Sequence, residues 1–182
     1  MTGPPSTFDD VIAFWRDAGP SRWYRKDEAF DRAFLDRFLM THEAAARGEL
    51  DHWMASPQGA LALCILLDQF PRNAFRGNPR MFATDAKARE IARAALNSGF
   101  DQQADAQLRQ FFIMPFMHSE DLSDQELCVR LAKNLPTDTL RHAVEHRDII
   151  ERFGRFPHRN AVLGRVTSPE EQRFLDEGGF GG

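Results

Sequence analysis

Apolar residues recur through most of the chain at the three- and four-residue spacing of an amphipathic helix, and no stretch keeps the period-two alternation of a strand. The first stripe consists of Phe8, Val11, Ile12 and Trp15. Capping side chains, prolines and glycines mark where successive helices begin and end. We expect helices over residues 7–17, 27–47, 49–55, 60–70, 86–98, 104–114, 119–134 (capped by Ser119 or Ser123), 136–153 and 157–163, with a last one after Ser168.

The segment 60–70 is apolar on nearly all sides, which predicts a central buried helix. Between residues 60 and 98, small and large residues alternate in a way that lets two helices of a hairpin approach closely, although an ordinary helical hairpin would show a similar pattern. We therefore predict an all-α fold of antiparallel helical hairpins, a tetratricopeptide-like right-handed array in one compact domain over residues 1–182. The glycine-rich residues 178–182 are expected to form a flexible tail.

The length of 182 residues and the hydrophobic content of 42% suit a single globular domain. No apolar run approaches the ~20 residues that cross a bilayer, and Met1–Phe8 has neither the positive nor the apolar region of a signal peptide. We expect a cytoplasmic protein without membrane insertion. Cys64 and Cys128 each lie alone in apolar surroundings, which predicts two buried thiols and neither a disulfide nor a zinc site.

The formal net charge of −4 argues against general nucleic-acid binding. Arginine nevertheless supplies all but three of the 23 cationic residues. Its planar, permanently charged side chain suits carboxylates and phosphates, although a GC-rich genome would also enrich arginine. The placement of the arginines is therefore more informative than their number.

Three segments are unusual for an ordinary helical surface. Residues 68–77 follow the most apolar helix, and the stretch from Gln69 to Thr84 holds three arginines and no acid. In residues 114–121 a proline precedes a polar cluster, and residues 146–160 combine histidines with arginines. We expect polar groups from these segments to converge in space.

The same segments carry a family resemblance. The strings LLDQFPRNAFRG, MPFMHSEDLSDQE and HRDIIERFGRFPHRNAVLGR resemble signatures of domain-of-unknown-function family 924, a widespread group of uncharacterised, mostly bacterial proteins classed as tetratricopeptide-like. The resemblance runs from Phe14 to Glu171. It implies the all-α fold and implies no reaction, so the functional interpretation depends on the residues themselves.

Helix N-termini after Ser119 and Pro157 expose N–H groups that favour anions, and arginines add paired donors. Aromatic residues would wall an apolar cleft. We expect Arg72, His118 and Arg159 to line one cleft, whereas the alternative is a structural network of arginine–carboxylate pairs between helix ends. The predicted ligand-binding residues are Trp23, Arg72, Asn73, Arg76, His118, Ser119, Arg155, His158, Arg159 and Asn160.

Histidine titrates near neutral pH and can transfer protons. The candidate catalytic residues are His118, Glu120, His146 and Asp148. With Glu120 and Asp148 the histidines could also form a metal site, but the one i, i+4 pair, His142 and His146, lacks the adjacent glutamate of metalloproteases, and we predict neither a metal nor another cofactor. The chain has no phosphate-binding glycine loop, no G-x-S-x-G elbow and no cysteine beside a histidine, so we do not expect nucleophilic catalysis by a known triad. His42 and His52 are interpreted as helix-surface residues.

The leading hypothesis is a helical protein with an Arg- and His-lined pocket for a small anionic ligand, or for an acidic segment of a partner. Acids near the arginines offset most of their charge, so a carboxylate or phosphate ester fits better than a polyanion such as nucleic acid. One alternative is an enzyme that acts on an anionic small molecule by His/carboxylate acid–base chemistry. Another is a tetratricopeptide-like peptide-binding scaffold. The oligomeric state is not predicted.

Overall fold

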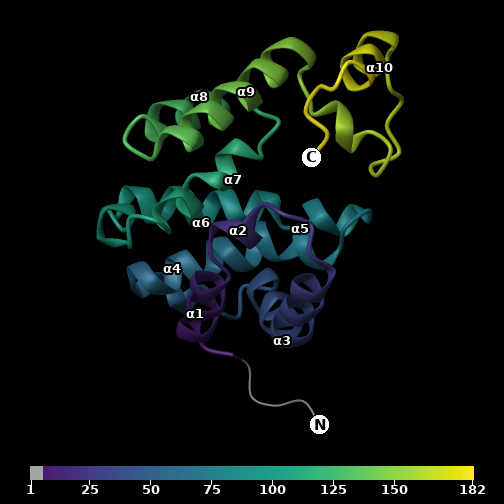
Figure 1. The fold of residues 1–182 in the computed structure, drawn as a ribbon. Coiled ribbons are helices and arrows are strands. Elements are labelled where there is room, and N and C mark those ends of the chain that lie inside the picture. The colour runs from purple at the N-terminus through teal and green to yellow at the C-terminus, as the bar shows by residue number, and fades with distance from the viewer. Residues whose placement is uncertain (1–5) are drawn as a thin grey trace. The chain divides into compact units, whose positions relative to one another are not determined.

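The structure, a computed structural model, describes residues 6–182, apart from the side chain of residue 137. These residues form helices and connecting turns and no strand (Figure 1), so the predicted all-α fold is confirmed. The first five residues of the predicted domain, and with them most of the stretch compared with a signal peptide, lie outside the described residues. No helix in the described part is long and apolar enough to cross a membrane.

The longer helices are α1 (Phe8–Ala18), α3 (Glu28–Ala46), α4 (Pro57–Cys64), α6 (Asp85–Asn97), α8 (Leu122–Ala132), α9 (Thr137–Phe153) and α10 (Pro169–Asp176). Short helices and helical turns connect them: α2 (Pro20–Trp23), η1 (Asp51–Ala55), η2 (Ile65–Gln69), α5 (Phe70–Ala74), η3 (Pro79–Phe82), η4 (Asp101–Gln103), η5 (Arg109–Phe112), α7 (Met114–Met117) and η6 (Pro157–Arg159).

Local capping explains where several helices begin and end. Ser168 and Glu171 form a reciprocal capping box that begins α10, and Thr7 forms the same arrangement with Asp10 at α1. Gly154, in the left-handed conformation at φ 68, ends α9. These boundaries agree with the predictions, because each of them depends on side chains within one turn of the helix end.

The predicted cap of α8 is wrong. Asp121 begins this helix in place of Ser119 or Ser123, since its carboxylate accepts the amides of Ser123 and Asp124. An ionised carboxylate is a stronger acceptor than a serine hydroxyl. The hydroxyl of Ser119 is instead bonded to the carboxylate of Asp124, at 2.8 Å.

The regular helix expected over residues 104–114 is also wrong. The structure has the short turns η4 and η5 in this region, and Pro115 lies in the first turn of α7 instead of ending a helix. Phe111, Phe112 and Ile113 are all buried. Successive residues of an α-helix differ by about 100° in direction, so a helix on the surface could not bury three in a row. Packing has therefore overridden the local helical preference.

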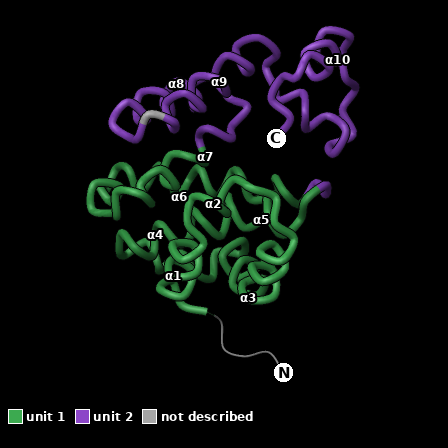
Figure 2. The backbone as a smooth tube through the Cα atoms, in the orientation of Figure 1, with its two compact units in different colours: residues 1–76, 80–115 green, residues 77–79, 116–182 purple. Residues whose placement is uncertain are grey.

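The chain divides into two compact units (Figure 2). Unit 1 comprises residues 1–76 and 80–115. Its centre is the segment 60–70, which is buried throughout as predicted, because α1, α3 and α6 pack around α4 and η2. Cys64 on α4 is a buried free thiol, as Cys128 is in unit 2, and both agree with the prediction.

The end of this central segment is a π-helical turn, η2, which the apolar pattern did not predict. Two side chains donate to carbonyls of the turn: His42 Nδ1 to Leu66 O at 2.9 Å and Thr84 Oγ1 to Leu67 O at 2.6 Å. His42 also stacks on Phe70, with ring centres 4.7 Å apart. It is only 4% exposed, so its interpretation as a helix-surface residue is wrong. Burial lowers the pKa of His42.

Unit 2 comprises residues 77–79 and 116–182. Helices α8 and α9 lie side by side as an antiparallel hairpin, and beyond Gly154 the loop 155–167 leads to α10 (Figure 1). A small apolar centre consists of Ile149, Ile150 and Phe156, with Phe153, Phe174 and Phe180 packed against it. The single domain and the right-handed tetratricopeptide-like array stay predictions.

Candidate functional site

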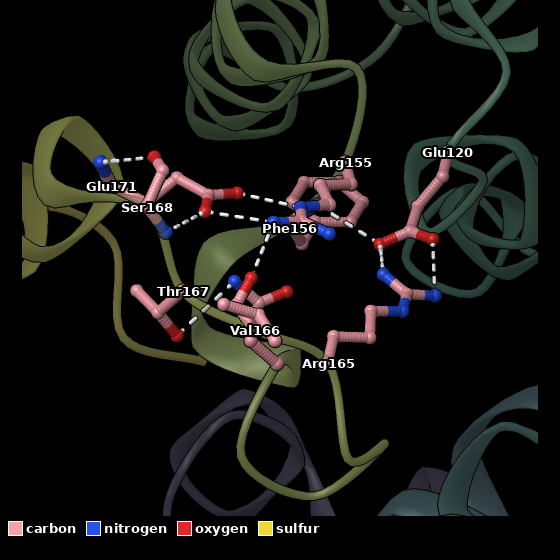
Figure 3. Close-up of polar contacts among 9 residues, drawn as sticks. Glu120, Arg155, Phe156, Arg165, Val166, Thr167, Ser168 and Glu171 are labelled. Atoms are coloured by element: carbon pink, nitrogen blue, oxygen red, sulfur yellow. Dashed lines mark hydrogen bonds and ion pairs between the residues drawn. The ribbon is translucent and has the colours of Figure 1, made fainter.

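Glu120, which lies just before α8, joins the start of the loop 155–167 to a residue near its end. Both oxygens of its carboxylate accept hydrogen bonds from Arg165, each at 2.8 Å, and one of them also accepts the main-chain N–H of Phe156 at 2.9 Å (Figure 3). Burial alone would raise the pKa of Glu120, but these donors and the nearby charge of Arg159 hold it below its ordinary value. Glu120 is therefore a fixed anionic clamp.

A second carboxylate, that of Glu171 in the first turn of α10, also joins the start of the loop to its end. Its carboxylate accepts two hydrogen bonds from Arg155, at 2.6 and 2.8 Å, and the main-chain N–H of Ser168 at 2.7 Å. Arg155 also donates to the carbonyl of Val166 (Figure 3). Hydrogen bonding from Arg155 is the main reason that the pKa of Glu171 falls to about 2. The loop is thus clamped at both ends by ionised groups.

Between these clamps the loop carries two residues to a place where α9 and the segment before α8 supply two more. His118, His146, His158 and Arg159 form what we call the histidine–arginine cluster. The rings of His118 and His146 are 6.5 Å apart, and Phe156 lies 5.4 Å from His146 and 5.6 Å from His158. His146, His158 and Arg159 thus lie around the buried ring of Phe156, and His118 joins them beside His146.

Arg159 and His146 are the buried members of the cluster. Arg159 Nη2 donates to the carbonyl of His118 at 2.9 Å, and its guanidinium carbon lies 4.5 Å from the centre of the Phe156 ring. The Nδ1 atom of His146 lies 2.8 Å from the carbonyl of His142. Because a carbonyl only accepts, this Nδ1 carries the proton, and in the neutral ring Nε2 keeps its lone pair.

The pKa of His146 is lowered from its ordinary value to about 3. Burial is the largest cause, followed by the proximity of His118, while the bond to the His142 carbonyl acts in the opposite direction. The charge of Arg159 lowers it further. The cluster therefore resists gaining positive charge unless a negative group joins it.

The predicted residues of unit 1 are bonded to other groups of that unit. Arg72 forms ion pairs with Asp68 and Asp85, and Asp31 receives hydrogen bonds from Asn73 and Arg76. Trp23 is buried against Trp15 and Phe111, and its indole N–H donates to the Trp15 carbonyl at 2.7 Å. These contacts correspond to the structural-network alternative. That Arg72 lines a cleft with His118 and Arg159 stays a prediction.

Three other candidates of unit 2 support the chain around the cluster. Ser119 bonds to Asp124 inside the unit, and Asn160 is fully buried and donates to Thr167. Asp148 is half-exposed and paired with Arg147 on the surface of α9. We assign these residues no direct role in the cluster.

Sequence reasoning named all four cluster residues but missed the aromatic residue that covers them. The ring of Phe180 lies 4.5 Å from that of His146 and 5.1 Å from that of His158. It falls in the run 178–182, which was expected to be a flexible tail. A single large apolar residue between glycines was the available signal. Arg165, the partner of Glu120, was missed as well because the two are 45 residues apart.

Beside the cluster, a surface hollow of about 440 Å³ lies between α9, α10 and the segment 178–180. Phe153, Phe174 and Phe180 provide its apolar part, and Arg141 and Arg152 lie among its polar residues. Within the described residues, no group of three or more His, Cys, Asp or Glu side chains is placed to hold a metal ion.

These observations define an all-helical protein in which a loop clamped by two carboxylates carries part of a histidine–arginine cluster. Residues 11–179 match the family described as "bacterial protein of unknown function (DUF924)", and the chain belongs to that family. It is similar to the solved structure of a protein of unknown function from Agrobacterium tumefaciens, with 52% identity over 94% of this chain and 97% of that chain and a TM-score of 0.92. No curated protein matches it.

Proposed function

We propose that this protein binds a small anionic ligand at the histidine–arginine cluster. The observation that carries the proposal is the gathering of two imidazoles and the buried guanidinium of Arg159 around the ring of Phe156, with the imidazole of His118 beside that of His146. Guanidinium N–H groups bind carboxylates and phosphates in proteins, whereas His146 can donate to an anion from Nε2 only when its ring is protonated, because its Nδ1 proton is bonded to the carbonyl of His142. The charge of Arg159 already acts on Glu120, and a bound anion would add a second negative group near the guanidinium.

The proposal predicts that binding strengthens as the pH falls. Burial and neighbouring positive groups keep the pKa of His146 near 3 in the free protein. A bound anion favours the protonated form of every histidine beside it and raises its pKa. Proton uptake and anion binding are therefore linked, and each promotes the other.

A calorimetric titration with sulfate, acetate and neutral acetamide tests the proposal. Sulfate keeps its charge from pH 5.5 to pH 8, so a change in its affinity reports on the protein. We expect sulfate and acetate to bind, acetamide not to bind, and Arg159→Ala to weaken sulfate binding roughly tenfold or more, as loss of a hydrogen bond from a charged donor implies.

The matched control is Arg152→Ala, which removes an exposed arginine of the same unit whose partner is Glu170. It should leave sulfate binding unchanged. Arg159→Lys keeps the charge and should bind more strongly than Arg159→Ala, with circular dichroism confirming the helical fold. Absence of binding by wild type, or equal losses in Arg159→Ala and Arg152→Ala, would show that the cluster only supports the fold.

Acid–base catalysis receives less support from the contacts. Glu120 is engaged on both oxygens by Arg165 and held ionised. The low pKa of His146 makes it a weak base near neutral pH. These groups suit the positioning of a charged ligand better than the transfer of a proton.

A further inference from the structure

The ring of Phe180, near the C-terminal end of the chain, packs against two histidines of the cluster. This ring lies 4.5 Å from that of His146 and 5.1 Å from that of His158, nearly perpendicular to the latter at 80°. Phe156 contacts both histidines as well. His146, Phe156 and His158 therefore form a ring slot, a place with the spacing that aromatic pairs prefer.

The residue that fills the slot lies in a glycine-rich segment whose first two residues, Gly178 and Gly179, donate to the carbonyls of Leu175 and Phe174 in α10. Apart from Phe180, all residues of the segment 178–182 are glycines. Gly178 and Gly182 have φ values of 83° and 99°, a region that glycine adopts easily and other residues rarely. Holding such a chain in one conformation costs more conformational entropy than holding any other residue type. Phe180 itself is only half-buried. The backbone freedom regained by the glycines thus offsets part of the cost of moving the ring out of the slot, where it packs against the apolar centre around Phe156.

The slot and the cationic group share one wall. The guanidinium carbon of Arg159 lies 4.5 Å from the ring centre of Phe156, and Phe156 also borders the slot. Phe156 is therefore a common neighbour of a ring in the slot and of the buried arginine. An acidic group attached directly to such a ring could reach Arg159 or His118.

From this we infer that the cluster takes an aromatic carboxylate, whose ring enters the slot by displacing Phe180. The inference rests on the proposed function, since the same cluster binds the acidic group. Phe180 then acts as an internal competitor: it covers the slot in the free protein and is exposed when the ligand is bound. The ring slot favours acids that carry an aromatic ring. The charge of Arg159 disfavours aromatic compounds that lack an acidic group.

The test compares three probes of similar size: benzoate, cyclohexanecarboxylate, which has the charge without the aromatic ring, and benzamide, which has the ring without the charge. Wild type should bind benzoate more tightly than either of the others. Phe180→Ala should bind benzoate about two- to tenfold more tightly than wild type, since one aromatic contact no longer competes. The matched control is Phe100→Ala, which removes a partly buried phenylalanine of unit 1 and should not change the affinity.

A spectroscopic measurement on the wild type keeps the test independent of whether a variant folds. With benzoate added, the NMR signals of the His146, His158 and Phe180 rings should all shift, and those of Phe180 should move toward values of an exposed ring. Unmoved Phe180 signals, or equal benzoate affinity in wild type and Phe180→Ala, would overturn the inference. If sulfate binds but benzoate does no better than cyclohexanecarboxylate, the ring slot fails and the proposed function stands. If no anion binds at all, both fail.

Discussion

His146 shows how far the surroundings of one residue can change its chemistry. Its ring is 5% exposed and lies among His118, His142, Phe156, Phe180 and Arg159. The apolar rings remove water, and the basic neighbours oppose a further positive charge. The folded protein consequently holds this histidine neutral over the whole range in which an unfolded histidine gains its proton.

This difference predicts a loss of stability in acid. The unfolded chain binds a proton near pH 6.5, whereas folded His146 binds it only near pH 3. Its contribution to stability is therefore complete above pH 6.5 and is lost as the pH falls toward 3. Between pH 7 and pH 5 wild type should lose about 2 kcal/mol more unfolding free energy than His146→Gln. Urea unfolding at several pH values measures it.

His142→Gln is the control, because it changes an exposed histidine one turn away on the same helix. Its pH profile should follow that of wild type closely. Parallel profiles for wild type and His146→Gln would mean that His146 gains its proton in the folded protein as readily as in the unfolded chain.

Among the secondary-structure elements, α10 is the one whose attachment matters most for the cluster. It has few residues of its own in the core, and its first turn is anchored by Glu171, which bonds to Arg155 and to Ser168. The same anchor holds the start of the loop that carries His158 and Arg159. A local capping residue thus also fixes the geometry of the candidate site.

Replacing this anchor should loosen the element selectively. Glu171→Gln keeps the size of the side chain but removes its charge, and it should cost about 1–3 kcal/mol of unfolding free energy. Hydrogen exchange of the α10 amides should accelerate. In wild type the contribution is present above pH 4.5 and disappears as the pH falls toward 2, because the folded pKa of Glu171 is about 2.

The neighbouring substitution Glu170→Gln provides the comparison. Glu170 pairs with Arg152 on the surface, where both side chains are more than half exposed, and such pairs contribute at most about 1 kcal/mol. Equal effects of the two substitutions would contradict the anchoring role of Glu171.

At the scale of the whole molecule, the two units differ in the size of their apolar centres. Unit 1 buries Trp15, Phe34, Phe70 and most of the segment 60–70. Among the described residues, unit 2 buries fewer large apolar side chains, namely Phe116, Met117, Ile149, Ile150 and Phe156. Since stability grows with the apolar area removed from water, unit 2 taken by itself should be the less stable of the two.

The tryptophans allow this to be measured, because Trp15, Trp23 and Trp53 all belong to unit 1. Tryptophan fluorescence follows unit 1, whereas far-UV circular dichroism follows the helices of both units. In a urea titration we expect the circular dichroism signal to begin its loss at a lower concentration than the fluorescence. Coincident transitions would instead support the single cooperative domain predicted from the sequence.

The sequence by itself determined most helices and many of their ends. Thr7 with Asp10, Ser168 with Glu171, and Gly154 act within a single turn, so their effects can be read from neighbouring letters. The failures occurred where tertiary packing competes with local preference, as in the three consecutive buried residues 111–113.

The candidate site could be predicted only in part. His118, His146, His158 and Arg159 were recognised because polar residues at proline-interrupted helix ends are unusual. Their grouping, the cover formed by Phe180 and the clamp between Glu120 and Arg165 depend on residues 28 to 45 positions apart meeting in space. Such contacts depend on the path of the chain and on which residues are buried. Burial also keeps His146 neutral. Neither can be inferred from the residues adjacent to it in the sequence.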